Sequence, residues 1–208
     1  MILVIGNWNY SSWSLRAWLA LKVFGFSFDE KRIPLYGPGA KEAILKYSPA
    51  GRVPVLIDGA TTVWDSLAIL EYLAEKNPQL WPSNADDRAR ARSVCAEMHS
   101  GFPSLRTHMS MNVRKRYPGK GRTPEVLSEI NRITEIWSAA KKPFLFGSFS
   151  GADAMYAPVV LRFRTYEVDL PAAAQGYYNA MLALPAMQRW IDAAEREAES
   201  IPQFDMYE

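Results

Sequence analysis

Every stretch that favours a β-strand lies within the first 64 of the chain's 208 residues. Residues 2–5 (ILVI) are apolar throughout, as expected of a buried strand, and residues 28–33 (FDEKRI) alternate apolar and charged side chains, as in a half-exposed strand. Residues 53–64 (VPVLIDGATTVW) predict a hairpin, because Asp58-Gly59 is a turn signal between two β-prone runs. Beyond residue 78 the apolar side chains recur only at helical spacing. We therefore expect an α/β unit followed by an all-α unit.

Two helices are predicted among these strands. Residues 14–24 carry apolar side chains at helical spacing, and residues 65–78 do the same between a cap at Asp65 or Ser66 and a final Asn-Pro. The intervening residues 36–51 are expected to form a loop with one or two helical turns. The order strand, helix, strand favours a right-handed βαβ crossover, so that roughly the first 80 residues form one compact unit.

The stretch PQLWPSNA, with its two prolines, marks the predicted domain boundary. We predict a first domain over residues 1–78, a linker over 79–85 and an all-helical domain over 86–208. In the second domain, residues 150–153 (SGAD) have the spacing of a capping box, with Asp in place of the usual Glu. Residues 184–200 are expected to form the last helix.

The composition excludes several classes of protein. A net charge of +2 gives no reason to expect a nucleic-acid partner, and the basic stretch at 114–122 lacks interleaved aromatic residues apart from one tyrosine. No apolar run approaches the length needed to cross a bilayer, and MILVIGNW is not a signal peptide, so we expect a cytoplasmic protein without a membrane partner. The single cysteine, Cys95, excludes an internal disulfide and a cysteine zinc site, and is expected to be a core or semi-buried residue. His99 and His108 have no ligand partners nearby in sequence, so no metal site is predicted.

Ser11 and Ser12 stand where the predicted first helix begins. A helix N-terminus offers unpaired N–H groups and a partial positive charge, and both favour an anion placed there. A neighbouring hydroxyl adds one more hydrogen-bond donor. Alternatively, Ser12 or Ser14 is simply the N-cap and Ser11 is a turn residue.

Two further dipeptides could contact a ligand. Proline is unusual in a strand, so Val53-Pro54 indicates either a sheet edge or a cis bond, which would free the Val53 backbone for an extended, peptide-like ligand. At Asp65-Ser66, the serine hydroxyl and N–H could hold a carboxylate while the aspartate meets an ammonium group. An ordinary trans proline and simple helix capping are the alternatives.

Three segments, SSWSLRAWLAL, SPAGRVPVLIDG and DSLAILEYLAEK, resemble the signature segments of the cytosolic glutathione transferases in both sequence and spacing. The resemblance covers essentially the whole chain. It implies a thioredoxin-like first domain with a cis Pro54, an all-α second domain and a two-fold homodimer active in detoxification. It also implies glutathione as the co-substrate and a small electrophile as its reaction partner.

The first of these segments is most similar to the zeta class, whose pattern is Ser-Ser-Cys-x-x-Arg. Ser11, Ser12 and Arg16 match this pattern, whereas Trp13 occupies the cysteine position. The departure counts against thiol-transferase chemistry by a protein cysteine and weakens the implication of maleylacetoacetate isomerase activity. Cys95 is no substitute, because it lies in the helical half of the chain.

The resemblance implies that the serine pair keeps the glutathione sulfur ionised, with Ser11 as the expected donor and Ser12 as the second candidate. A free thiol with a pKa near 8.5 is only about 3% ionised at pH 7, and a hydrogen bond together with a helix N-terminus favours the thiolate. By the same resemblance, the remaining glutathione contacts are the Val53 backbone beside a cis Pro54, Asp65, Ser66 and, as a weaker candidate, Lys41.

The acceptor substrate is expected between the domains, in a permissive apolar pocket lined by Trp13, Met98, Phe102 and Arg106. Most such residues on helices belong to the core, which is the alternative here. Arg106 and the 114–122 stretch could favour an anionic acceptor, although a solvated loop is the simpler interpretation of that stretch. Two other functions stay open: an isomerase that returns glutathione unchanged, and a non-catalytic glutathione-binding protein.

Overall fold

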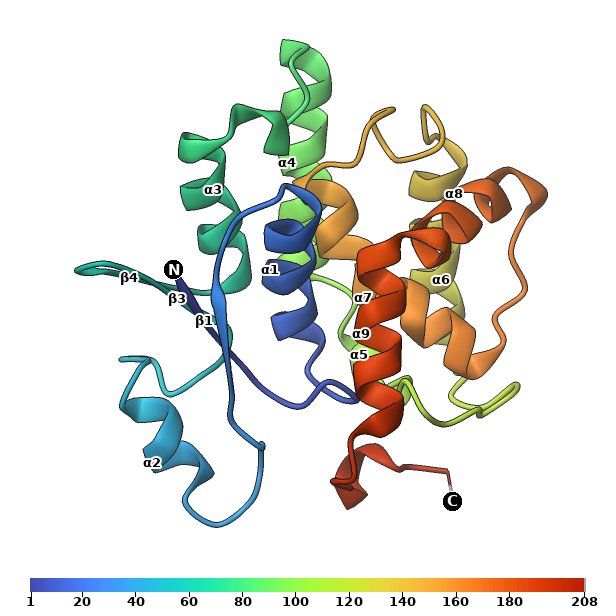
Figure 1. Ribbon diagram of the computed structural model, residues 1–208. Helices are drawn as coiled ribbons and strands as arrows, with labels where there is room; N and C mark the ends of the chain where they lie inside the picture. Colours follow the sequence, from blue (N-terminus) through green and yellow to red (C-terminus); the bar gives the residue numbers. More distant parts are fainter. Residues whose placement is uncertain (208) are drawn as a thin grey trace.

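The computed structural model describes residues 1–207 and confirms the predicted architecture, an α/β half followed by an all-α half (Figure 1). The elements of the first half are β1 (Ile2–Ile5), α1 (Ser12–Val23), β2 (Asp29–Arg32), α2 (Ala40–Leu45), β3 (Val55–Asp58), β4 (Thr61–Trp64) and α3 (Ser66–Lys76). The sheet has the strand order β2-β1-β3-β4. β1 runs parallel to β2, as a βαβ crossover requires, and antiparallel to β3, which pairs with β4. This is the thioredoxin-like arrangement that the family resemblance implied.

The hairpin turns one residue later than predicted. Asp58 and Thr61 are paired across the two strands, so the loop residues are Gly59 and Ala60 rather than Asp58 and Gly59. The Asp58 side chain accepts the Tyr72 hydroxyl (2.9 Å), which holds the hairpin end against α3. Gly59 adopts a φ of 59°, a conformation that glycine reaches without the steric penalty of a side chain.

The second half is built from α-helices joined by loops. Its last helix ends earlier than predicted, at Arg196 rather than residue 200, because Glu197 turns away in an extended conformation and its carboxylate binds elsewhere in the fold. The helices are α4 (Ala85–Ser100), α5 (Pro103–His108), α6 (Pro124–Ser138), α7 (Gly151–Tyr166), α8 (Ala172–Ala183) and α9 (Pro185–Arg196), with short 3-10 turns at Pro78–Leu80 and Pro202–Phe204.

Helix α1 lies between the sheet and the second half, and packs against α3 on one side and α7 and α9 on the other (Figure 1). Nearly all of its residues from Ser12 to Leu21 are buried, so it has no solvent-facing stripe. Trp18 of α1 makes edge-on contacts with Trp8 (5.5 Å between ring centroids) and with Trp190 of α9 (5.3 Å). One continuous apolar core therefore joins the two halves through α1.

The predicted capping box at the start of α7 is confirmed. The Asp153 carboxylate accepts the Ser150 N–H (2.8 Å), the Ser150 hydroxyl (2.9 Å) and the Leu145 N–H (3.0 Å). Asp153 is fully buried, and burial raises its pKa to about 6 despite these hydrogen bonds. Cys95 is also fully buried, as predicted, and burial raises the pKa of its thiol. Over residues 1–207, the structure contains no helix both apolar enough and long enough to span a bilayer.

Candidate active site

The chain leaves β1, crosses a loop over residues 6–11 and enters α1 two residues earlier than predicted. Ser11 is the N-cap, and its carbonyl accepts the Leu15 N–H (3.2 Å). The cap is therefore neither Ser12 nor Ser14, and the Ser11 side chain caps no backbone N–H. Its hydroxyl is used in another way.

A chain of polar contacts ties the start of α1 to the end of β1. The Gly6 N–H donates to Ser14 Oγ (3.0 Å), and the Ser14 and Ser11 hydroxyl oxygens lie 2.7 Å apart. A Cβ at Gly6 would lie 2.7 Å from Leu35 Cδ1 and 3.0 Å from Ser11 Oγ, so a side chain there would displace Leu35 and press on the Ser11 hydroxyl. Ser11 and Ser12 are both nearly buried, but within residues 1–207 the Ser12 hydroxyl makes no hydrogen bond.

The Val53-Pro54 peptide bond is cis, as the resemblance implied, and lies just before β3. The Val53 N–H and C=O make no hydrogen bond to another backbone group of the described chain. An extended ligand could therefore pair with them, as a further strand would. A second cis bond, at Lys142-Pro143, was not predicted.

Asp65 caps α3 and also contacts the second half of the chain. One carboxylate oxygen accepts the Leu67 N–H (2.8 Å), which is the capping role, and the other lies 3.2 Å from His99 Nε2 on α4. The Asp65 backbone has a φ of 72°, which is unfavourable for a residue with a side chain and is typical of functional sites. The next residue, Ser66, is fully buried.

Arg16 of α1 is a buried cation that lies next to Ser66. It is 1% exposed, and its Nη1 lies 3.4 Å from Ser66 Oγ, a weak contact. Its Nε and Nη2 find no hydrogen-bond partner in the described residues. Burial lowers the pKa of this guanidinium well below its usual range, and the nearby Arg106 and Arg162 lower it further. An uncompensated buried charge is costly, so this region favours an anion.

Trp13 stands where the two halves meet, with cationic side chains around its ring. The guanidinium carbon of Arg16 lies 4.2 Å from the ring centroid and that of Arg106 lies 5.2 Å from it, and the His99 ring packs edge-on at 5.2 Å. Arg162 of α7 adds a third guanidinium; burial, followed by Arg106, lowers its pKa to about 9. The three guanidinium groups, from α1, α5 and α7, lie close enough to lower one another's pKa.

The other residues predicted for the acceptor pocket differ in exposure. Met98 is 2% exposed and Phe102 is 6% exposed, whereas Arg106 is only partly buried and donates from Nε to the Gly101 carbonyl (3.0 Å). Met98 and Phe102 are therefore part of the core around Arg106. The pocket assignment stays a prediction.

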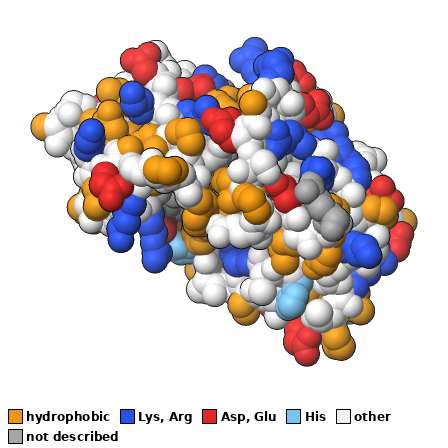
Figure 2. Space-filling view, turned by 90° about the horizontal axis from the view of Figure 1, so that it is seen from below, with side chains coloured by type: hydrophobic (Ala, Val, Ile, Leu, Met, Phe, Trp, Pro, Cys, Tyr) orange, Lys and Arg blue, Asp and Glu red, His pale blue; other side chains and the backbone are white. Residues whose placement is uncertain are grey.

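Lys41 lies on α2, at the edge of the molecule in Figure 1. Its side chain is exposed, and no hydrogen bond or ion pair joins it to another described residue. The face seen in Figure 2 carries Lys and Arg side chains in separate groups, with Asp and Glu between them and hydrophobic side chains across its middle.

Sequence reasoning missed the role of His99. It was considered only as a metal ligand, and among residues 1–207 no group of three or more His, Cys, Asp or Glu side chains could hold a metal. Its contact with Asp65 links two segments far apart in sequence, and no local pattern signals such a pair. Arg16 matched a motif position, but its burial without partners became visible only in the fold.

Comparisons with known proteins match both halves. The family model described as "Glutathione S-transferase, N-terminal domain" matches residues 10–76, and "Glutathione S-transferase, C-terminal domain" matches residues 88–193. Maleylacetoacetate isomerase of Rattus norvegicus is 31% identical over 189 residues, which is 85% of each chain.

Two solved structures share the fold. A glutathione transferase homologue from Burkholderia, solved with bound glutathione, superposes with a TM-score of 0.72 at 22% identity, over 94% of this chain and 98% of the other. A holo structure of maleyl pyruvate isomerase, described as a bacterial zeta-class protein, gives a TM-score of 0.70 at 22% identity, over 96% and 100%.

Proposed function

The chain belongs to the glutathione S-transferase family and lies near its zeta class, and from this premise we propose that it ionises glutathione at the start of α1 for attack on a small electrophile. The observation that carries the proposal is the Gly6–Ser14–Ser11 chain of contacts at a buried helix N-terminus. The catalytic serines are Ser11, as the donor to sulfur, and Ser12, as the second candidate.

The contacts around Ser14 would allow the Ser11 hydroxyl to donate its hydrogen to the glutathione sulfur. In the ligand-free protein the Ser11 hydroxyl donates to Ser14 Oγ, which also accepts the Gly6 N–H. A hydroxyl hydrogen rotates freely, so when glutathione binds the Ser11 proton can turn to the sulfur while Ser14 donates to Ser11 Oγ in its place. Each bond in such a chain polarises the next, and a charge-assisted bond to a thiolate is stronger than a neutral one. A pKa depression of about two units requires roughly 2.7 kcal/mol. A charge-assisted bond of about 1.5–3 kcal/mol, with the helix dipole, can supply it.

The remaining glutathione contacts follow from the same premise. The free Val53 backbone beside the cis Pro54 pairs with the cysteinyl part of the tripeptide. Ser66 and Asp65 hold the carboxylate and ammonium of the γ-glutamyl group, and Arg16 supports that carboxylate from behind Ser66. These groups are the chemical complement of a zwitterionic head.

Lys41, exposed on α2, is a weaker candidate for the glycine carboxylate.

The acceptor lies against Trp13, beside Met98, Phe102 and Arg106. Three guanidinium groups in this region, those of Arg16, Arg106 and Arg162, favour an acceptor that carries negative charge. An isomerase that uses glutathione and returns it unchanged is the second candidate function, and the similarity to a rat maleylacetoacetate isomerase favours it specifically.

We also propose that the protein is a cytoplasmic homodimer whose partners are glutathione and the electrophile, without a metal, a nucleic acid or a membrane. The family resemblance supports the dimer, and the composition supports the rest.

Serine substitution tests the proposal. In Ser11→Ala the pKa of bound glutathione, measured from thiolate absorbance, should rise by one unit or more. Below that pKa, kcat/KM should then fall about tenfold. Ser12→Ala should have the smaller effect, because the Ser12 hydroxyl is outside the chain of contacts. A larger effect of Ser12→Ala would reassign the donor, and unchanged pH–rate profiles in both variants would contradict the proposal.

Product analysis separates the candidate functions. Purified protein is incubated with glutathione and a panel of neutral and anionic electrophiles, and the masses of the products are determined by mass spectrometry. A conjugate contains the mass of the tripeptide, whereas an isomer does not. Binding to immobilised glutathione without turnover of any acceptor would favour the non-catalytic alternative.

A further inference from the structure

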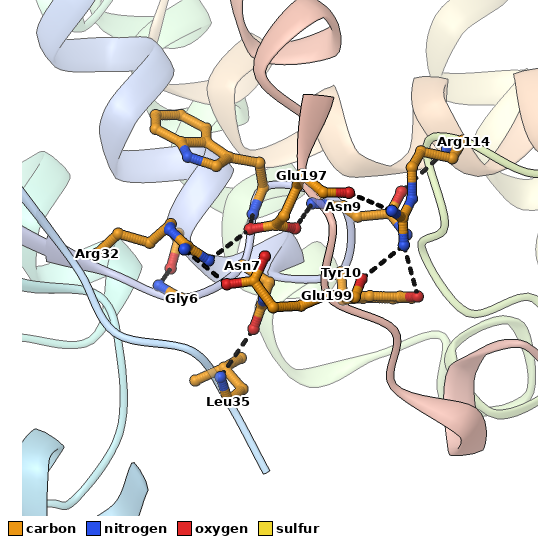
Figure 3. A network of polar contacts seen from close by, with 11 residues as sticks. Gly6, Asn7, Asn9, Tyr10, Arg32, Leu35, Arg114, Glu197 and Glu199 are labelled. Carbon is orange, nitrogen blue, oxygen red and sulfur yellow. Dashed lines mark hydrogen bonds and ion pairs between the residues drawn. The ribbon is translucent and has the colours of Figure 1, made fainter. Parts of the chain in front are cut away.

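The C-terminal segment, residues 197–207, contacts the loop that leads to the serine pair (Figure 3). Glu197, the first residue beyond α9, places its carboxylate against this loop: Oε1 accepts the Trp8 N–H (3.0 Å) and Oε2 accepts the Asn9 N–H (2.9 Å). Arg32 of β2 donates from Nη1 to the same Oε1 (2.9 Å). The Glu197 side chain is only 2% exposed, so these three donors replace its hydration.

A second attachment is made at Tyr10, the residue before Ser11. Its hydroxyl donates to Asp205 Oδ1 (3.0 Å) and accepts the Ile201 N–H (3.3 Å). Arg114 reaches the same hydroxyl from Nη2 (3.2 Å), and it also donates to the Glu197 carbonyl. The C-terminal segment therefore holds three consecutive residues of the loop.

The loop in turn sets the position of both serines. The Ser11 N–H donates to the Asn7 carbonyl (2.9 Å), and the Ser12 N–H donates to the Tyr10 carbonyl (3.0 Å). A displacement of the loop is therefore passed directly to the two hydroxyls. Hydrogen bonds weaken steeply outside a narrow range of distance and angle, so a donor displaced by about 1 Å loses most of its effect on a thiolate.

The contacts of Glu197 go beyond what is needed to anchor the segment. Tyr207 already anchors it through a hydroxyl bond to the His108 carbonyl (2.8 Å), and the Phe204 carbonyl accepts the Ser110 hydroxyl (3.0 Å). Among the described residues, by contrast, the Glu197 carboxylate bonds only to the two loop amides and Arg32. The buried Glu197 carboxylate therefore serves to hold the loop rather than the C-terminal segment.

We propose that the C-terminal segment is the positioning element of the serine pair, acting through Glu197 on the Trp8 and Asn9 amides and through Asp205 on the Tyr10 hydroxyl. This inference rests on the proposed function, because its readout is the ionisation of bound glutathione. Neither carboxylate touches the substrate. Both act through the loop.

The test is Glu197→Gln, with Glu199→Gln as the matched control. The glutamine amide can accept only one of the two loop N–H groups and turns a donor toward the other. We expect the pKa of bound glutathione to rise by about half a unit to one unit, which lowers kcat/KM about three- to tenfold below the pKa and leaves it near the wild-type value at high pH. Amide exchange at Trp8 and Asn9 should also accelerate.

The control removes the same charge two residues further on. The Glu199 carboxylate contacts Arg32 (2.6 Å) but no loop amide, so Glu199→Gln should leave the thiol pKa and the exchange rates unchanged. A folded Glu197→Gln with the wild-type thiol pKa would overturn the proposal, as would an equal shift in both variants. If Glu197→Gln does not fold, Asp205→Asn decides: a raised thiol pKa supports the proposal and an unchanged one overturns it.

Measurements on the wild type distinguish a failure of the proposed function from a failure of the positioning role of the C-terminal segment. If it binds no glutathione or leaves the thiol pKa at its free value, the proposed function fails, whatever the variants do. If it lowers the thiol pKa and the Glu197 and Asp205 variants lower it equally, only the positioning inference fails.

Discussion

At the scale of single residues, Arg16 shows how the fold can hold an incomplete interaction. Two of its guanidinium nitrogens have no acceptor in the described chain, although the side chain is almost fully buried. Leaving a buried polar group unpaired costs about 1–3 kcal/mol, and more for a charged group. The third nitrogen reaches Ser66, at the start of α3 where the γ-glutamyl carboxylate is proposed to bind. Binding of that anion would compensate the buried charge.

Replacing Arg16 by methionine should weaken glutathione binding. We expect the dissociation constant of glutathione to rise about tenfold or more, because a charge-assisted contact contributes about 1.5–3 kcal/mol. The free energy of unfolding of the ligand-free protein should stay the same or increase, since an unpaired buried charge is removed. Calorimetric titration and thermal melting measure the two quantities.

Arg162→Met is the control for this prediction. It removes a buried guanidinium of the same group of arginines, whose Nε bonds to the Met109 carbonyl rather than to Ser66. Its glutathione affinity should therefore be close to that of the wild type. Equal weakening by both substitutions would mean that the general positive field, rather than the contact with Ser66, attracts glutathione.

At the scale of the element, the start of α7 depends on one buried carboxylate. The Asp153 carboxylate accepts three hydrogen bonds, two from Ser150 and one from Leu145. It therefore stabilises both the N-terminus of α7 and the loop before it. Its pKa, raised to about 6 by burial, lies well above the value of about 3.9 for an exposed aspartate. The folded state therefore binds a proton more tightly than the unfolded state at this residue.

This difference predicts a pH-dependent stability. The contribution of Asp153 is fully present below about pH 4 and is lost as pH rises through about 6, because the buried carboxylate must then ionise. A shift of about two units corresponds to about 3 kcal/mol. The unfolding free energy of wild type minus that of Asp153→Asn should fall by up to this amount between pH 4 and 7, as measured by urea unfolding. Ser150→Ala keeps the carboxylate but removes a hydrogen bond that lowers its pKa, so the fall should persist and extend to higher pH.

At the scale of the whole molecule, the two halves share one core. Leu15, Trp18 and Leu19 of α1 belong to the same apolar cluster as Met155 of α7 and Trp190 of α9. A helix that completes the first half is thus buried largely against the second half. The linker predicted at residues 79–85 rests on a change in sequence character alone, and the apolar core is continuous across it.

We therefore predict a single cooperative unfolding transition. Tryptophan fluorescence, to which Trp18 and Trp190 at the meeting of the halves contribute along with the chain's other five tryptophans, should give the same midpoint as far-UV circular dichroism. A fragment of residues 1–84 should not melt cooperatively, because it exposes one face of α1. Two separated transitions in the full chain, or a cooperative transition in the fragment, would contradict this prediction.

Much of the fold could be predicted from the sequence, because the decisive signals are local. Sequence patterns located the strands and the helices α1, α3 and α9, the SGAD spacing located the α7 cap, and a turn signal located the hairpin to within one residue. The helix boundaries at Ser12 and Arg196 were less accurate, because each is set by contacts that propensity does not contain.

What the sequence alone determined is thus the order of elements, the family and the residues at the start of α1. The tertiary structure decided which partners those residues have: Arg16 behind Ser66, His99 beside Asp65, and Glu197 beneath the Trp8 and Asn9 amides. The reason is physical. Local patterns reflect the short-range preferences of the backbone. The partners of a buried charge are instead set by which segments fold together, and these can be as many as 189 residues apart in sequence.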